Sequence, residues 1–254
     1  MEFIAKSGGD GGAIAIFPLV AAIISLVFGI LLFRQFRERR RPYQALWAIA
    51  MLMFAAASAA LFAGTLFGWN AGLYRTYWLF GAVLNVPFLA MGECYLLIKS
   101  RTLNRVLLAI LLVTSVLAAI VIVTASASRL ALRQDLPLGR DVWGPESLAL
   151  HLAQYYAYPT YLFLLGGTLW SAWRMRGAPA LRNRFFGTLA IAGGATVVAA
   201  GAAFAATGVL VGLSLTLVAG VALMFWGFLL ASRPTETPGT AGPAAAGNTT
   251  TSAD

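Results

Sequence analysis

Long apolar stretches separated by short, arginine-rich polar segments form the pattern of this chain. Seven of the stretches are long enough to cross about 30 Å of hydrocarbon at a rise of about 1.5 Å per residue. They occupy residues 13–33, 45–68, 77–98, 106–125, 157–173, 186–207 and 209–231. The pattern predicts an all-α fold, in which residues 13–231 form a polytopic membrane protein, a bundle of seven transmembrane helices.

The segments outside the predicted spans are short, with two exceptions. Residues 126–156 form a long loop, and its last part, 147–156, is predicted to be an interfacial helix that leads into the fifth span. Residues 232–254 are rich in Ser, Thr, Pro, Gly and Ala, a composition typical of disorder. Residues 1–12 precede a first span that is predicted to stay uncleaved, because an arginine cluster follows it instead of a small-residue cleavage site.

The distribution of basic residues predicts the orientation of the chain in the membrane. The segments 34–44, 99–105, 174–185 and 232–254 together hold 13 Lys and Arg, whereas the opposite set of segments, of almost the same total length, holds five. Short loops rich in Lys and Arg remain in the cytoplasm. We therefore expect the N-terminus outside the cytoplasm, the loop 126–156 outside as well, and the C-terminal tail inside.

One basic cluster contributes most to this asymmetry. It comprises Arg34, Arg37, Arg39, Arg40 and Arg41. We interpret these residues as topology determinants; contact with anionic lipid headgroups or with a partner is the alternative.

Aromatic residues near the predicted span ends agree with this orientation, because Trp and Tyr favour the membrane interfaces. The outer set is Trp69, Tyr74, Tyr77 and Trp78, and the inner set is Tyr43, Trp47, Trp173 and Trp226. We expect the first set to lie at the outer interface and the second near the inner one.

Composition supports the membrane interpretation and excludes other classes. The chain is 60% hydrophobic and 11% charged, whereas soluble domains are roughly 45–50% apolar and about 25% charged. The net charge of +9 does not indicate a nucleic-acid-binding protein, because the basic residues are spread in short runs between apolar segments. The predicted partners are the lipid bilayer and a membrane or cytoplasmic protein. The single cysteine, Cys94, excludes an internal disulfide and is interpreted as a small apolar core residue.

Small residues recur at four-residue spacing on three predicted spans, which lets helix backbones approach closely in lipid. The stripes are Ala56, Ala60 and Gly64 on the second span, Ala195, Ala199, Ala203 and Thr207 on the sixth, and Gly212, Thr216 and Gly220 on the seventh. We interpret them as contacts inside a compact monomeric bundle, with a homodimer interface as the alternative.

Glu93 is the one formally charged residue inside a predicted span. A carboxylate in hydrocarbon is unfavourable unless it is paired, hydrated or protonated. Asn85 lies near the same helical face, and Pro87 removes a backbone donor and is expected to kink the helix. Asn85, Pro87 and Glu93 therefore form a candidate intramembrane polar site for a proton, an ion or a ligand. A structural glutamate bonded to a neighbouring polar side chain is the alternative.

The loop 126–156 supplies a second candidate site, for a small ligand or a protein partner. Its candidate residues are Arg133, Asp135, Arg140, Asp141, Trp143 and His151. The sole histidine, His151, is interpreted as a surface or interfacial residue, with a pH-sensing or ligand-binding role as the alternative. The carboxylates of this loop lack metal-ligand spacing, which disfavours an enzyme acting on lipid or isoprenoid substrates.

Residue types exclude several cofactors. A retinal protein needs a lysine inside a late span, and the two lysines, Lys6 and Lys99, lie outside the spans. Bis-histidine haem ligation needs two histidines, and an intramembrane zinc site needs several His, Cys or carboxylate ligands. The sequence therefore predicts no cofactor, no metal site and no catalytic residue.

Four stretches resemble one group of proteins. The run GWNAGLYRTYWLFGAVLNVPFLAMGECYLL at 68–97, the inner loop containing Pro42, the run LPLGRDVWG and the run MFWGFLLA are similar to uncharacterised seven-helix integral membrane proteins of actinobacteria. The resemblance covers most of residues 40–231. It implies a bacterial cytoplasmic membrane location and no assigned activity. Glu93 departs from this pattern, in which a small polar residue is expected at its position.

Two functions remain open at this point. We expect a non-enzymatic, sensor-like or accessory membrane component. Its outer loop would bind a small ligand or a protein partner, and its basic inner loops would contact a cytoplasmic or membrane partner. The alternative is a transporter or permease for a small solute, an ion or a lipid, with a path near the third span.

Overall fold

The structure is a computed structural model that describes residues 10–177 and 181–232. All regular structure in these two ranges is helical. The long helices are α1 (Asp10–Arg39), α2 (Pro42–Phe67), α4 (Asn85–Leu97), α5 (Arg101–Thr124), α7 (Leu148–Met175), α8 (Arg182–Thr207) and α9 (Leu210–Ala231). The short helices are α3 (Ala71–Tyr77), the π-helix η1 (Trp78–Leu84), the 3-10 helix η2 (Ala131–Arg133) and α6 (Gly139–Trp143). The expectations for residues 1–12 and 232–254 fall almost entirely outside the described residues.

Six helical segments have the length and hydropathy needed to cross a membrane. They are α1 from Gly12, α2, the continuous run Ala71–Leu97 made of α3, η1 and α4, α5, α8 and α9. These segments indicate a membrane-embedded, all-helical protein, which confirms that part of the prediction. The helix α7 is not among them, because its Tyr, Trp, Pro and Gly residues lower its hydropathy. With 28 residues, α7 is nevertheless about 42 Å long.

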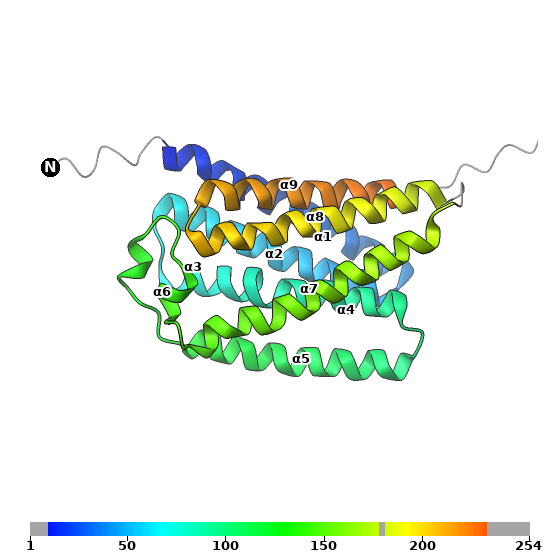
Figure 1. The fold of residues 1–254 in the computed structure, drawn as a ribbon, viewed down its shortest axis with the longest axis horizontal. Helices are drawn as coiled ribbons and strands as arrows, with labels where there is room; N and C mark the ends of the chain where they lie inside the picture. Colours follow the sequence, from blue (N-terminus) through cyan, green and yellow to red (C-terminus); the bar gives the residue numbers. More distant parts are fainter. Residues whose placement is uncertain (1–9, 178–180, 233–254) are drawn as a thin grey trace, which may run out of the picture.

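Six long helices form a closed ring. Helix α1 packs against α2, α2 against α4, α4 against α7, α7 against α8, α8 against α9, and α9 against α1. The long helices run side by side along the long axis of the molecule (Figure 1). The ring includes α7, although its hydropathy is lower than that of its neighbours. Its interior is therefore enclosed by helices on all sides.

Helix α5 lies outside this ring, at the edge of the bundle (Figure 1). It packs against α4, η1 and α7. Its remaining surface is lined by exposed apolar side chains, namely Leu103, Val106, Ile110, Leu112, Val113, Val116, Leu117, Ile120 and Val123. A contiguous apolar surface of this kind suits hydrocarbon rather than water.

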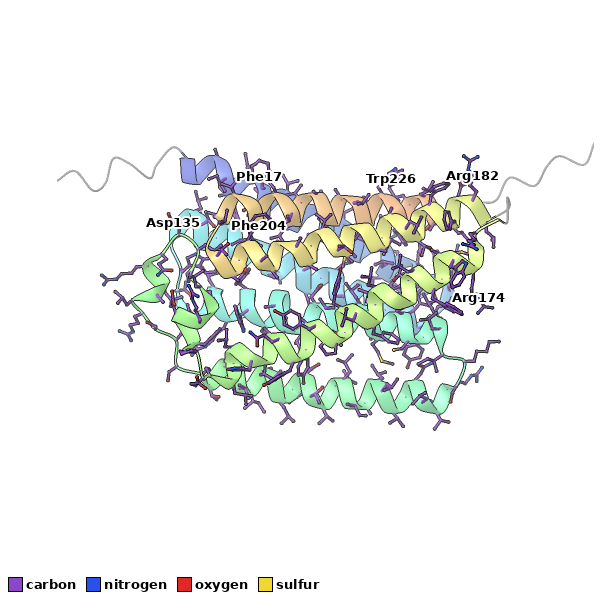
Figure 2. The ribbon with its side chains drawn as sticks, viewed as in Figure 1. Phe17, Asp135, Arg174, Arg182, Phe204 and Trp226 are labelled. Atoms are coloured by element: carbon purple, nitrogen blue, oxygen red, sulfur yellow. The ribbon has the colours of Figure 1, made fainter. Side chains whose placement is uncertain are left out.

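The two ends of the bundle differ. The connection between α5 and α7 folds over one end, which we call the cap end; we call the other the arginine-rich end. Figure 2 shows Asp135 at the cap end, and Arg174 and Arg182 at the arginine-rich end. The described segments at the arginine-rich end are the α1–α2, α4–α5 and α7–α8 connections, which carry most of the basic residues.

The predicted topology determinants lie at the arginine-rich end, but the segment 34–44 is not the loop we expected. Helix α1 continues to Arg39, so Arg34, Arg37 and Arg39 lie on its last turns. Arg40 then adopts a positive φ of 52°, and Arg41 is the N-cap residue of α2. The helix extends because long polar side chains at a helix end can reach the interface while the backbone stays helical.

Glycines bring α8 and α9 into backbone contact. A Cβ atom built at Gly187 would lie 2.5 Å from the carbonyl oxygen of Gly227, and one at Gly194 would lie 2.5 Å from that of Gly220. Gly201 continues the seven-residue spacing on α8. Such contacts between small residues are the usual means of close helix association in membranes.

The small-residue stripe predicted on the seventh span lies in this contact. Positions Gly212 and Thr216 of α9 face Phe204 and Gly201 of α8. On α8, the glycines at seven-residue spacing make close contacts with α9. Ala203 and Thr207, at the end of the predicted stripe on α8, are exposed.

The third span is one helical run interrupted by a π-helix. Helix η1 follows α3 directly and continues directly into α4. Pro87 has no N–H to pair with the preceding turn, so the change in hydrogen bonding falls on its N-terminal side. Asn85, at the start of α4, donates from Nδ2 to the carbonyl oxygen of Ala50 on α2 at 2.7 Å. The irregularity that we expected as a kink at Pro87 is therefore accompanied by a π-helical segment before it.

Aromatic side chains of the α2–α3 turn and the third span hold the cap. Three of them donate hydrogen bonds to carbonyl oxygens of the cap connection and α7: Trp69 to Asp135 at 2.9 Å, Tyr74 to Pro137 at 3.2 Å and Trp78 to Ala149 at 2.9 Å. Trp69 and Tyr74 are buried. Trp69 and Tyr74 are therefore covered by the cap, and their expected place at the outer interface stays a prediction.

Candidate functional site

Glu93 faces the centre of the six-helix ring and is 4% exposed. Its Oε1 accepts a hydrogen bond from Ser171 Oγ of α7 at 3.4 Å. Within the described ranges, its other carboxyl oxygen has no hydrogen-bond partner, and no Lys or Arg nitrogen lies within 4.0 Å of the carboxyl group. The carboxyl group is therefore held by one long hydrogen bond from a hydroxyl group and has no cationic partner.

Two glycines make room for this arrangement. A Cβ atom at Gly167 of α7 would lie 3.0 Å from Glu93 Cγ. A Cβ atom at Gly92 would collide with the indole of Trp47, which donates from Nε1 to the carbonyl oxygen of Leu89 at 3.1 Å. The glycines allow α7 and α2 to approach α4 on either side of the glutamate.

A cavity of about 100 Å³ adjoins the Glu93 carboxyl group, and all six helices of the ring line it. Its polar lining comprises Glu93 and the hydroxyl groups of Thr168, Ser171 and Thr188. Its aromatic lining comprises Phe28, Trp47 and Phe228, and the rest is aliphatic. A largely apolar enclosure with a few convergent polar groups is typical of a small-molecule site. A dry cavity of about 150 Å³ can hold benzene, so this cavity suits a smaller molecule.

The three residues of the predicted intramembrane site do not share one place. Glu93 lines the cavity, whereas Asn85 and Pro87 do not. Asn85 is eight residues before Glu93, about 12 Å along an α-helix. Its amide is used to join α4 to Ala50 of α2.

The partners of Glu93 on α7 were not among the predicted site residues. Ser171 and Thr168 of α7 both line the cavity, and the missing side chain of Gly167 leaves room for that of Glu93. The run of small and hydroxyl residues at 166–168, followed by Ser171 within an aromatic span, is the signal that could have indicated this helix.

The candidate residues of the outer loop have separate positions and roles. Trp143 is buried, with its ring centre 5.6 Å from that of Tyr74. His151 lies in the first turns of α7, where Nδ1 is 2.9 Å from the Ser147 carbonyl oxygen and the ring stacks on Tyr155. Trp143 therefore packs against an aromatic side chain of α3, and His151 contacts residues of the start of α7.

The charged residues of the same loop remain nearer the solvent. Arg140 Nε and Asp141 Oδ1 lie 3.7 Å apart in an exposed pair. Asp135 contributes its backbone carbonyl to Trp69, as described above. Arg133 lines a second pocket at the cap end, together with Arg75 and residues of the same loop. The six predicted loop residues are thus not brought together into one site.

Among the described residues, no cluster of three or more His, Cys, Asp or Glu could hold a metal ion. Comparisons of the sequence with protein-family models, with curated proteins and with solved structures found no match. The fold and the cavity define a membrane-embedded helical protein whose ring encloses a single carboxyl group.

Proposed function

We propose that the protein is a non-enzymatic, sensor-like or accessory membrane component that binds a small ligand in the Glu93 cavity. The observation that carries the proposal is the enclosure of one unpaired carboxyl group, with three hydroxyl groups, at the centre of a six-helix ring. The proposal moves the ligand site from the outer loop, where the sequence placed it, into the bundle.

The lining favours a small alkylammonium ion as the ligand. A carboxylate and hydroxyl oxygens accept hydrogen bonds from an ammonium group. The faces of Phe28, Trp47 and Phe228 add the attraction of aromatic rings for cations. The aliphatic remainder of the lining suits a short alkyl chain. A bound cation also supplies the partner that a membrane-embedded carboxylate needs.

The test is thermal unfolding of the protein in lipid nanodiscs with propylammonium, and with 1-propanol as the uncharged probe. Binding to the folded state alone stabilises it by about 2.7 kcal/mol at a ligand concentration of 100 Kd. We expect propylammonium to raise the unfolding temperature of the wild type, and 1-propanol to have a much smaller effect. Glu93→Gln should lose the response to propylammonium.

Glu146→Gln is the matched control, because Glu146 is exposed in the cap connection and far from the cavity lining. This variant should respond as the wild type does. An equal response of the wild type and Glu93→Gln would contradict the proposal, since binding would then not involve the cavity carboxyl group.

A transporter or permease for small cations is the second candidate. The observation that favours it is the π-helix η1 in the span that carries Glu93. Interrupted helices occur at the substrate sites of membrane transporters, and π-helical segments occur frequently at functional sites. Radiolabelled methylammonium flux into proteoliposomes separates the two functions: flux that Glu93→Gln abolishes supports transport, and binding without flux supports the sensor-like component.

We also propose seven spans, with the N-terminus outside and the C-terminus inside a bacterial cytoplasmic membrane. The proposal is supported by the length of α7 and its place in the ring. The concentration of Lys and Arg at one end of the bundle supports the orientation, because such loops stay in the cytoplasm. The similarity to actinobacterial seven-helix proteins described above supports the bacterial location.

Labelling of single cysteines tests this topology. In a Cys94→Ala background, Gln134→Cys would report on the cap end and Asn183→Cys on the arginine-rich end, since both side chains are exposed. A membrane-impermeant maleimide added to intact cells should label the first variant and not the second. The reverse labelling would refute the orientation, and labelling of both from one side would refute the odd number of spans.

A further inference from the structure

Three arginines converge on a pocket at the cap end. The pocket has a volume of about 420 Å³ and lies between the start of α3 and the connection that follows α5. Arg75, Arg129 and Arg133 line it, with Trp69 and Asn70 beside them. The pocket shares no lining residue with the Glu93 cavity.

A backbone carbonyl holds one of these arginines in the pocket. Arg75 Nη2 donates to the carbonyl oxygen of Ala125, the C-cap residue of α5, at 2.9 Å. The Arg75 Nε atom is buried and has no hydrogen-bond partner. Arg129 lies in the turn before the 3-10 helix η2 and Arg133 is the last residue of η2; both are exposed and both line the pocket. One guanidinium is thus held by a backbone carbonyl, and two exposed ones lie beside it.

No carboxylate neutralises this group within the described ranges. The ion pair found there joins Arg140 to Asp141, and no other acidic oxygen lies within 4.0 Å of an arginine nitrogen. Three guanidinium groups around one pocket repel each other unless an anion lies between them. A guanidinium offers paired N–H donors that match the oxygen atoms of carboxylate and phosphate groups. A tetrahedral phosphate has enough oxygens to accept from all three.

We propose that Arg75, Arg129 and Arg133 form a binding site for a phosphate group at the cap end. Under the proposed orientation, this site faces outward at the level of the lipid headgroups. The phosphate therefore has two sources, a lipid headgroup in the surrounding leaflet or a soluble phosphate in the external solution. Both present the same oxygens to the pocket, and the following experiment distinguishes them.

The experiment uses the full chain in nanodiscs of phosphatidylcholine, whose headgroup is zwitterionic. In one arm, inorganic phosphate is titrated and unfolding temperature is recorded. In the other arm, phosphatidic acid replaces part of the lipid and no soluble phosphate is added. We expect stabilisation of the wild type in at least one arm. Stabilisation by inorganic phosphate identifies a soluble source, and stabilisation by phosphatidic acid alone identifies the headgroup.

The double variant Arg129→Gln/Arg133→Gln removes two of the three charges at exposed positions, so it leaves the contact of Arg75 with Ala125 in place. Charge-assisted hydrogen bonds contribute about 1.5–3 kcal/mol each, so the apparent affinity should fall by tenfold or more. The control is Arg140→Gln, an exposed arginine of the same connection outside the pocket. It should bind as the wild type does.

Three results would overturn the proposal. The first is that neither arm stabilises the wild type, and the second is that the double variant keeps wild-type affinity. The third is that Arg140→Gln weakens binding as much as the double variant does, which would indicate a general charge effect. Arg75→Lys adds a geometric check, because lysine keeps the charge without the paired donors. It should weaken phosphate binding, and unchanged affinity in this variant would also count against the site.

Discussion

Replacement of Gly194 by alanine should weaken the contact between α8 and α9. A Cβ atom at this position would lie 2.5 Å from the Gly220 carbonyl oxygen, whereas ordinary van der Waals contact begins at 3.4 Å. The clash is with backbone, so no side chain can move away to relieve it. The two helices must therefore separate by roughly 0.9 Å at this point, the difference between these two distances.

The expected cost follows from two opposing effects. Overfilling a tight contact costs about 1–3 kcal/mol. Alanine is more favourable than glycine in a helix by about 0.5–1 kcal/mol. Gly193 is the matched control, because its added Cβ would meet Leu223 at an ordinary distance of 3.5 Å. Both variants gain the helix-propensity effect, so Gly194→Ala should be less stable than Gly193→Ala by about 1–3 kcal/mol.

The measurement is reversible unfolding in mixed micelles, followed by far-ultraviolet circular dichroism, for the wild type and both alanine variants. A reduced unfolding free energy for Gly194→Ala, with Gly193→Ala equal to or above the wild type, is the expected result. Equal stability of the two variants would refute the reasoning, because it would mean that the glycine contact does not hold the helix pair together.

Two further changes probe the third span. Asn85→Ala removes the buried amide that bonds to the Ala50 carbonyl oxygen, so the same unfolding assay should show a loss of about 1–3 kcal/mol; an unchanged midpoint would argue against this contact between α2 and α4. Trp78→Phe removes the donor to Ala149, so the free energy of opening of the cap connection should fall by about 0.5–1.5 kcal/mol, measured as faster hydrogen exchange. The exposed indole of Trp226 supplies the control, and equal exchange in Trp78→Phe and Trp226→Phe would contradict a role in holding the cap.

The helical, membrane-embedded character of the protein could be predicted from the sequence because it depends on segment length and apolar content alone. Each predicted span lies largely within a helix of the structure. The ends were predicted less well where charged residues continue a helix, as in α1 up to Arg39. Arginine marks the position of the interface in a sequence, and a helix can pass through that interface without ending.

The burial of Trp69 and Tyr74 could not be inferred from their types. Tryptophan and tyrosine near a span end suit a lipid interface and a buried hydrogen-bonded cluster equally well, because both environments satisfy one polar atom and a large apolar ring. The deciding fact is tertiary: the connection between α5 and α7 returns over these rings and offers them carbonyl acceptors.

The candidate site was predictable in part. Glu93 was recognisable, because a carboxylate in an apolar span is rare and costly. Its neighbours on α7 are far away in the sequence, and their hydroxyl and glycine types are common in membrane helices. The helix contact through Gly187, Gly194 and Gly201 was missed because a four-residue spacing was sought, whereas these glycines are seven residues apart.

The π-helix gives the third span an uneven tolerance to changes in length. An i→i+5 turn accommodates one residue more than an α-helical turn, and one residue corresponds to roughly 100° of rotation. Deleting one residue within Trp78–Leu84 would regularise the helix and leave Glu93 directed at the ring centre. The same deletion between Phe88 and Glu93 would swing the carboxyl group about a quarter turn away from α7. A deletion of one residue is thus better tolerated before Pro87 than after it.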